Sequence, residues 1–259
     1  MPLHAKSCVP RAELAQAAMA RRSPAPVSGH AAIARVLGGE ILSGARKPGS
    51  RMPSVDEMFA LFGVSRVVVR EVTKTLAAKG LVTAKTKVGT LVLAPSHWNW
   101  LDPDVLAWRA SLGLDVAFLN QIGEVRLAVE PLSAALAARN AGRQDRQQIK
   151  TALRQMHDAG GDHRKFADAD LAFHVAVGQA SGNPFFRSFT AVIQVALSGI
   201  LAKTSVGVIA DEKTHARSTA RHEKVLAAIE AGDEDDARKA MVRVIEEGLK
   251  HSGAKRRAR

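Results

Sequence analysis

Two helix-start signals, separated by the length of one short helix, constrain the fold of the N-terminal half more than any other feature. Ser54 precedes "VDEMFALF", Glu57 completes the spacing of a capping box, and Gly63 ends the segment. Ser65 then precedes "RVVVREVTKTLAA", which ends at Gly80. A chain with these signals must form two short helices joined by a tight turn.

The segments on either side complete a small domain. Before the two helices, "AAIARVLGGEILSG" places apolar residues at helical spacing. After them, "LVTAKTKVGTLVLAP" alternates and is rich in β-branched residues, with Gly89 suited to a hairpin turn. We expect the second capped helix to have an apolar side made of Val68, Val72, Leu76 and Ala77. Three short helices and a β-hairpin predict a winged helix-turn-helix domain over residues 28–95.

The positive charge of the chain is concentrated in its first part. The chain has 37 Lys and Arg against 25 Asp and Glu, a formal net charge of +12. Residues 28–95 hold ten basic and four acidic residues, and residues 1–27 hold four and one. Most of the remaining excess lies in the C-terminal "KRRAR", so the body of the second half is nearly neutral. A basic module joined to a neutral one predicts binding to a polyanion, with a generally basic surface as the alternative.

The ends of the chain and its single cysteine add weaker constraints. Residues 1–27 contain four prolines and predict a disordered basic leader, and residues 253–259 predict a basic tail. Cys8 is the only cysteine, which excludes an intramolecular disulfide. The sequence has neither a run of 18 apolar residues nor a secretory signal, so we expect a cytoplasmic protein without a membrane span.

After a linker over residues 96–102, the sequence pattern is helical. Asp102 is the expected N-cap of a helix that begins with Pro103, and Asp115 is the expected N-cap of a long helix. The apolar stripe of that long helix consists of Phe118, Ile122, Val125, Val129, Leu132 and Leu136. Later helices are expected over residues 143–159, 163–180, 183–203, 212–231 and 233–251. The predicted fold class is therefore mainly α, with an antiparallel bundle of six or seven helices over residues 103–252 after the winged domain.

The second capped helix carries the charges expected of a DNA-recognition helix. Arg66 and Arg70 lie one turn apart on one face, and an arginine can donate two hydrogen bonds to guanine or to a phosphate. Ser65 and the helix N-terminus suit a backbone phosphate. Lys85 and Lys87 on the hairpin are placed to reach neighbouring phosphates. We therefore expect this helix to enter the major groove of double-stranded DNA.

Four polar side chains are directed at the interior of the helical half. Asp170 and His174 lie on the apolar side of their helix, His222 precedes apolar residues at helical spacing, and Arg126 lies at the edge of an apolar stripe. These groups need partners, because an unpaired buried charge costs several kcal/mol. One carboxylate and two imidazoles suit a divalent transition metal with open coordination positions. The simpler alternatives are hydrogen-bonded core histidines and an ion pair between Asp170 and Arg126.

The segment "PGSRMPSVDEMFALFGVSRVVVREVTKTLAAKGLVTAKTKVGTLV" resembles the DNA-binding domain of the GntR family of bacterial repressors. The matched positions are Pro48, Gly49, Pro53, Ser54, Val64, Ser65, Arg66, Val69, Arg70, Glu71, Leu76, Gly80, Leu81, Gly89 and Thr90. The resemblance adds Gly89 and Thr90 to the expected DNA-binding residues. One position departs from the family pattern, because Asp56 stands where members usually have a basic residue, and we leave it out of the site.

The helical half resembles the effector-binding domain of the FadR subfamily. The shared positions are Asp170, Phe173, His174, Asn183, Pro184, His222, Ala228, Ile229, Gly232 and Asp233. The resemblance implies a divalent metal ion, with zinc as the expected metal, on Asp170, His174 and His222. It also makes Arg126 in "EVRLAVEP" the arginine that binds an effector carboxylate. Many members have another histidine at the position of Val244, so that ligand is missing, and the three side chains could instead bind the effector directly.

The linker "WNWLDPDVLAW" and the missing histidine resemble the sugar-acid branch of the subfamily, in particular repressors of D-galactonate catabolism. The resemblance implies a homodimeric repressor that leaves its operator DNA when a small carboxylate or sugar acid binds the helical domain. We expect no enzymatic activity, because the sequence offers no general base near the cluster and no nucleophile or phosphate-loop motif. The alternatives are a GntR-family regulator of another organic acid, an all-helical metal-dependent hydrolase, and nonspecific binding of nucleic acid.

Overall fold

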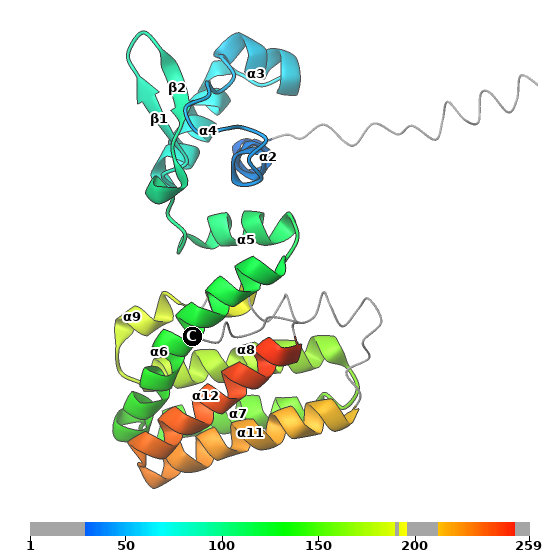
Figure 1. The fold of residues 1–259 in the computed structure, drawn as a ribbon, viewed down its shortest axis with the longest axis vertical. Coiled ribbons are helices and arrows are strands. Elements are labelled where there is room, and N and C mark those ends of the chain that lie inside the picture. Colours follow the sequence, from blue (N-terminus) through cyan, green and yellow to red (C-terminus); the bar gives the residue numbers. More distant parts are fainter. Residues whose placement is uncertain (1–28, 190–191, 196–211, 252–259) are drawn as a thin grey trace, which may run out of the picture.

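The computed structural model describes residues 29–189, 192–195 and 212–251. The predicted leader, the predicted basic tail and Cys8 lie outside these residues. Figure 1 shows two bodies along the long axis of the molecule, a small N-terminal domain with a β-hairpin and a larger helical bundle, with helix α5 between them.

The N-terminal domain has the predicted winged helix-turn-helix architecture. Its helices are α2 (His30–Leu42), α3 (Val55–Phe62) and α4 (Arg66–Ala78). Strand β1 (Val82–Lys85) pairs antiparallel with β2 (Gly89–Val92), in the register that places Val82 opposite Val92 and Lys85 opposite Gly89. The hairpin therefore forms a wing beside α4 (Figure 1).

Local hydrogen bonds explain where α3 and α4 begin. The Ser54 hydroxyl accepts a hydrogen bond from the Glu57 amide (3.2 Å), and the Glu57 carboxylate accepts one from the Ser54 amide (2.6 Å). Gly63 ends α3 with a left-handed φ of 65°, which glycine adopts without a Cβ clash. Ser65 then caps α4. The tight turn between the two helices is thus specified by residues within it.

The core of this domain lies between α2, α4 and the hairpin. The apolar side expected for α4 is wrong in two places, because Val69 is buried where Val68 is only partly buried, and Ala77 is exposed. The buried strip consists of Val69, Val72 and Leu76. These three residues form a narrow strip that packs against α2, and the opposite face of α4 is left in solvent.

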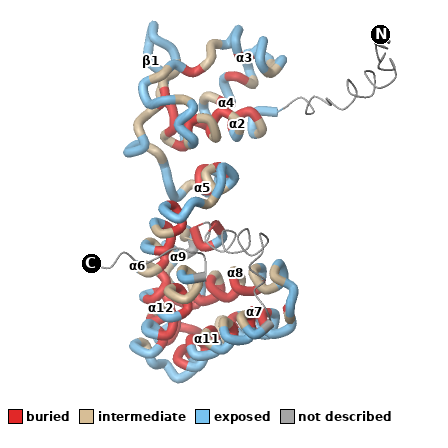
Figure 2. The backbone as a smooth tube through the Cα atoms, turned by 45° about the vertical axis from the view of Figure 1, so that its right-hand side comes forward, coloured by how far each residue is buried: buried red, intermediate tan, exposed pale blue. Residues whose placement is uncertain are grey.

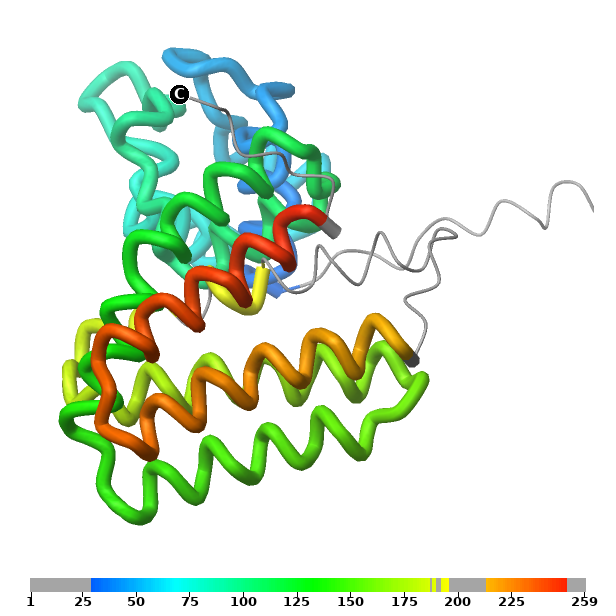
Figure 3. The backbone as a smooth tube through the Cα atoms, turned by 60° about the horizontal axis from the view of Figure 1, so that its bottom comes forward, coloured from blue at the N-terminus to red at the C-terminus, as the bar shows by residue number. Residues whose placement is uncertain are grey.

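The rest of the described chain is helical. After the 3-10 turn η1 (Pro95–His97) come α5 (Pro103–Ser111), α6 (Val116–Asn140), α7 (Arg143–Asp158), α8 (His163–Ala180), α9 (Pro184–Arg187), α11 (Glu212–Ala231) and α12 (Glu234–His251). α6 packs against α12, α8 and α11, and α7 packs against α8 and α11 (Figure 3). The described helices include none that is both long enough and apolar enough to span a membrane.

The expected helix over residues 183–203 is wrong in its first part. α9 ends at Arg187 and a turn follows at Ser188, where the expectation was continuous helix. Residues 192–195 are helical again, and residues 196–203 lie outside the described residues. The N-cap at Asn183, whose side chain accepts a hydrogen bond from the Phe185 amide, explains why a helix begins there even though it is short.

Alanines form much of the bundle core along α6. Leu132, expected in the apolar stripe, is 41% exposed, whereas Ala134, Ala137 and Ala138 are at most 3% exposed. Toward the C-terminal end of α6, the buried residues therefore lie on a different side of the helix from the predicted stripe. The reason is that α8, α11 and α12 all pack against α6. Figure 2 shows the buried residues, in red, along the bundle helices.

Candidate functional sites

The exposed face of α4 carries the two predicted DNA-contacting arginines. Arg66 and Arg70 are exposed, whereas Val69 and Val72 of the same helix are buried. The Ser65 hydroxyl accepts a hydrogen bond from the Val68 amide (3.5 Å) and so serves as the helix cap. The two arginines are therefore free to meet DNA at the start of α4, as predicted, and their contact with DNA stays a prediction.

The wing presents its predicted residues to solvent. Lys85 and Lys87 are exposed on the hairpin, and Thr90 follows on β2. Lys87 has a φ of 64° and Gly89 a φ of 103°, so the turn uses two left-handed residues, of which only one is a glycine. Arg51, which the sequence reading did not single out, lies beside the wing: a Cβ added at Gly89 would lie 3.1 Å from Arg51 Nε. The only sequence signal for Arg51 was its charge.

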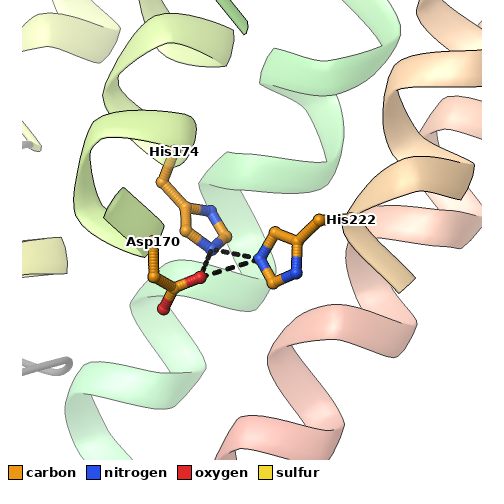
Figure 4. A group of neighbouring side chains, drawn as sticks. All are labelled: Asp170, His174 and His222. Atoms are coloured by element: carbon orange, nitrogen blue, oxygen red, sulfur yellow. Dashed lines mark hydrogen bonds and ion pairs between the residues drawn. The ribbon is translucent and has the colours of Figure 1, made fainter. Parts of the chain in front are cut away.

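Three side chains predicted to hold a metal converge inside the bundle (Figure 4). Asp170 and His174 come from α8 and His222 comes from α11, and one ligand atom from each lies within 4.8 Å of the other two. His222 Nε2 is 2.8 Å from Asp170 Oδ1, and the two histidine Nε2 atoms are 3.4 Å apart. His174 and His222 are 3% and 2% exposed, and Asp170 is 9% exposed. The structure therefore brings together the three side chains that the resemblance implied as ligands.

Arg126 joins this cluster together with Glu130, which the sequence reading missed. Arg126 Nε lies 2.5 Å from Glu130 Oε1, and Arg126 Nη2 lies 3.3 Å from His174 Nε2. Glu130 Oε2 lies 2.5 Å from His174 Nδ1. Arg126 and Glu130 are each 5% exposed. The available signal was the spacing of four residues between an arginine and a glutamate on one helix, which places the two on the same side.

The contacts of His174 determine which of its nitrogens carries the proton. A nitrogen without a proton would be repelled by a carboxylate oxygen at 2.5 Å, so Nδ1 carries the proton, although the angle of this contact is poor for a hydrogen bond. Nε2 faces the guanidinium of Arg126, which can only donate. With Nδ1 bound to Glu130, Nε2 is the atom that His174 would offer to a cation shared with Asp170 and His222. A carboxylate bound to the far nitrogen is the arrangement that orients histidine ligands of metals.

The contacts of His222 lead to a similar conclusion. Its Nδ1 lies 2.8 Å from the Ser218 carbonyl oxygen, which can only accept, so Nδ1 is protonated. Its Nε2 therefore faces the cluster, 2.8 Å from Asp170 Oδ1. Asp170 Oδ1 is buried and has no hydrogen-bond partner among the described residues. A divalent cation between Asp170 Oδ1 and the two Nε2 atoms would satisfy all three atoms, so the residues fit a metal.

The fourth ligand found in many FadR-subfamily members has no counterpart at Val244. Val244 is 8% exposed and belongs to the hydrophobic core of the bundle. Within the described residues, the one group of three or more potential ligands close enough to share an ion is Asp170, His174 and His222. Three protein ligands leave coordination positions for oxygens of another molecule.

Paired charges set the ionisation of the cluster. Burial alone would raise the pKa of Glu130, but Arg126 and His174 lower that pKa to about 2. Burial also opposes ionisation of Asp170, yet His222, His174 and Arg126 lower its pKa. Burial would lower the pKa of Arg126, but Glu130 raises it. Both carboxylates and the guanidinium are therefore charged at neutral pH.

A narrow cleft adjoins the cluster on the side of His174 and Glu130. Most of its lining is apolar and includes Val129, Val177, Phe189 and Ile193. Ser133 also lines it, 3% exposed, with a hydroxyl oxygen that has no hydrogen-bond partner among the described residues. Because buried hydroxyls are nearly always paired, Ser133 is notable as a polar group of this lining whose hydrogen-bonding capacity is unused among the described residues.

Two family models cover most of the chain. Residues 30–92 match the model described as bacterial regulatory proteins, gntR family, and residues 121–247 match the FCD domain. The chain belongs to the GntR family. The FCD domain places this GntR-family chain among the FadR-subfamily transcription regulators, as the sequence resemblance implied.

Curated relatives and solved structures agree with that family. The galactonate operon transcriptional repressor of Escherichia coli K12 is 33% identical over 82% of this chain and 92% of its own length. The HTH-type transcriptional regulator LutR of Bacillus subtilis is 31% identical over 78% of this chain and 91% of its own length. A structure titled for Lar, which controls the Listeria monocytogenes agr system, aligns with a TM-score of 0.60 at 16% identity, over 87% of this chain and 97% of its own. At that identity, the solved structure supports the fold alone.

Proposed function

We propose that this GntR-family chain is a homodimeric, cytoplasmic repressor that leaves its operator when a small hydroxylated monocarboxylate of the sugar-acid class binds beside Asp170, His174 and His222. The observation that carries the proposal is the convergence of these three side chains next to a buried arginine. The relative named for the galactonate operon supports the sugar-acid class. Two copies would present two α4 helices to the half-sites of a pseudo-palindromic operator.

The charge of the cluster explains why a monocarboxylate fits. The carboxylates of Glu130 and Asp170 lie beside one permanent cation, Arg126. A divalent cation held by Asp170, His174 and His222 would add two positive charges and open coordination positions. The cluster would then hold one excess positive charge, which a monocarboxylate neutralises and a neutral sugar leaves unpaired, at a cost of several kcal/mol.

We keep Arg126 as the proposed partner of the effector carboxylate and add Glu130 to the proposed site. Because its guanidinium is already bound to Glu130, the effector must share it with that residue. Glu130 in turn holds His174 through Nδ1, so a shift of Arg126 is transmitted to the proposed metal ligand. We propose that Arg126 and Glu130 act as a unit in effector binding.

The apolar cleft supports a second candidate effector of the same chemical class. A cleft lined mainly by valine, phenylalanine and isoleucine, with one unpaired hydroxyl at Ser133, suits a short acid with few hydroxyl groups better than a long polyol. A panel that includes both short and long hydroxy acids separates the two candidates.

Thermal unfolding of the full-length protein tests the metal site. With zinc or manganese in excess of its dissociation constant, we expect the melting temperature to rise by several degrees and a chelator to reverse the rise, because a ligand specific for the folded state stabilises it by about 2.7 kcal/mol at a hundredfold excess. Asp170→Asn should abolish the rise. His163→Asn, which alters the separate pair of His163 and His215, should retain it. An equal rise in Asp170→Asn would contradict the assignment.

Release from DNA tests the effector. Fluorescence anisotropy on an operator selected from a random library should show dissociation on addition of D-galactonate or a shorter hydroxy acid, and none with galactose. The double variant Arg126→Gln with Glu130→Gln removes both charges but keeps similar shapes, so it should bind the operator and ignore the acid. If that double variant is released by the acid as readily as the wild type, the buried cluster is not the effector site.

A further inference from the structure

Lys79, the residue that ends α4, is buried at the boundary between the two domains. Its Nζ lies 2.8 and 3.0 Å from the two oxygens of Asp102 and 2.7 Å from Asp104 Oδ2. The same ammonium lies 5.4 Å from the centre of the Trp108 ring. Lys79 is 7% exposed, and lysine is rarely buried unless it is paired. Because Lys79 is buried against these carboxylates, it cannot serve as a DNA-contacting lysine, and another role must explain it.

The backbone around Lys79 is held to the same segment. The Lys79 carbonyl oxygen accepts a hydrogen bond from the Asn99 amide (2.9 Å). At Gly80, an added Cβ would lie 2.1 Å from the His97 carbonyl oxygen. At Gly38 of α2, an added Cβ would lie 2.3 Å from the Trp108 ring. The contact at Gly38 leaves Trp108 of α5 no room to move toward α2, and the contact at Gly80 holds the segment before α5 to the end of α4.

Asp102 joins two helices with one carboxylate. Its Oδ1 accepts hydrogen bonds from the amides of Asp104 (2.9 Å) and Val105 (3.1 Å), which caps α5. The same carboxylate binds Lys79. Burial by itself would lower the pKa of Lys79, but its hydrogen bonds to Asp102 and Asp104 raise it, so the ammonium stays charged. The end of α4 and the first turn of α5 therefore share one ionic contact.

The junction between α5 and α6 repeats this pattern nearer the surface. Asp115 caps α6 by accepting a hydrogen bond from the Phe118 amide (2.8 Å), and it pairs with Arg109 of α5. The Asp115 side chain is 55% exposed, against 20% for Asp102. The loop between these helices contains Gly113 with a φ of 110°. Arg109 also donates a hydrogen bond to the Gly113 carbonyl oxygen (2.9 Å) and lies over the Phe118 ring. The carboxylate of this pair is open to solvent, however, so the ion pair at Asp115 is weaker than the one that Lys79 makes with Asp102.

We propose that Lys79 is a positioning residue that fixes α5 to the recognition helix, so that the N-terminal domain and α5 turn as one body about residues 112–115. α5 is built for this role, because Val105 and Trp108 belong to the core of the N-terminal domain while Leu106 packs in a cluster with Phe118 of α6. Figure 1 shows α5 between the two bodies. For regulation, effector binding at Arg126 must also be transmitted along α6 to residues 112–115. That part of the proposal alone rests on the proposed function.

Unfolding of the full-length protein with two probes tests the rigid junction without any effector. All three tryptophans, Trp98, Trp100 and Trp108, lie in the linker or in α5, so fluorescence reports this junction, whereas far-ultraviolet circular dichroism reports mainly the bundle. We expect coincident midpoints in the wild type. In Lys79→Met the fluorescence midpoint should fall by roughly 5 °C below that of the circular dichroism.

Two further variants control this measurement. Lys150→Met breaks an exposed ion pair with Glu230, inside the bundle, and should keep the midpoints together. Asp104→Asn removes the more exposed carboxylate partner and should separate them by less than Lys79→Met does, which keeps the test available if Lys79→Met does not fold. Coincident midpoints in both Lys79→Met and Asp104→Asn would overturn the proposal, as would separate midpoints in the wild type.

Operator binding with and without the effector then tests transmission. Lys79→Met should bind the operator alone and the effector alone as the wild type does, but the effector should no longer weaken operator binding by the roughly 5- to 150-fold typical of allosteric coupling. Lys79→Arg should restore part of the coupling. Full coupling in Lys79→Met would overturn the role of Lys79. If no acid releases the wild type, the proposed function fails, while the two-probe unfolding still decides where the rigid junction lies.

Discussion

Apart from Lys79, the N-terminal domain keeps its charges outside, including those predicted to meet DNA, whereas the helical bundle buries the charges proposed to bind the effector. Arg66 and Arg70 are exposed over an apolar core, while Arg126 and Glu130 are each 5% exposed and bound to each other. A DNA duplex is too large to enclose, so charges that meet it must stay in solvent, where salt screens them. A small acid can be enclosed, and the enclosing charges must then be balanced within the protein.

The largest effect expected from this contrast is on the stability of Arg126→Ala. Removal of the guanidinium leaves Glu130 charged and buried without its partner, which should lower the free energy of unfolding by about 3–5 kcal/mol. Urea denaturation followed by circular dichroism measures the change. Arg70→Ala is the matched control and should stay within about 0.5 kcal/mol of the wild type. Equal losses in the two variants would erase the distinction between the two domains.

The double variant Arg126→Met with Glu130→Met sharpens the same contrast. Because it removes both buried charges and fills their volume with apolar atoms, it should recover much of the stability that Arg126→Ala loses. It leaves His174 without its carboxylate, so some loss should persist. A double variant no more stable than Arg126→Ala would show that the ion pair is not the source of the effect.

The next effect is on DNA binding by Arg66→Ala. Loss of a bidentate base contact should weaken operator binding by about 1–3 kcal/mol, with little change in thermal stability, because the side chain is exposed. Anisotropy titrations at several salt concentrations distinguish a base contact from a phosphate contact, since loss of a phosphate contact also reduces the salt dependence by about one ion. An unchanged affinity would remove Arg66 from the interface.

The smallest expected effect is at the wing. Lys87→Asn removes one charge from a residue with a left-handed φ of 64°, a conformation that asparagine adopts more easily than lysine. The free energy of unfolding should rise by up to about 0.5 kcal/mol, while operator affinity falls and its salt dependence weakens. Both changes can be measured on one preparation. A loss of stability would mean that the lysine makes a contact within the folded wing.

Features that depend on neighbours along the chain were predictable. The capping box at Ser54 and the left-handed Gly63 act within a few residues, so the short helices followed from the sequence. The positions of Asp170, His174 and His222 on apolar helix faces also follow from local periodicity. Their closeness to one another was an inference from resemblance, and the structure brings them together.

Features that depend on packing between distant segments were missed. Glu130 looks like an ordinary surface glutamate, and its burial requires α8 to bring His174 against it. Lys79 follows a run of exposed residues, and only the return of the chain at Asp102 buries it. Packing between distant segments also explains why Val69 is buried on α4 where Val68 was predicted. The direction from which α2 approaches decides which strip of α4 is buried.

For this protein, the sequence by itself determined where most of the helices lie, that Arg66 and Arg70 are exposed, and that Asp170, His174 and His222 face inward. These properties arise from hydrogen bonds and periodicity within single segments. The tertiary structure alone decided that Glu130 completes the buried cluster and that Lys79 ties the recognition helix to α5. Both depend on groups brought together by chain folding over dozens of residues, and no local rule specifies which distant carboxylate will neutralise a buried charge.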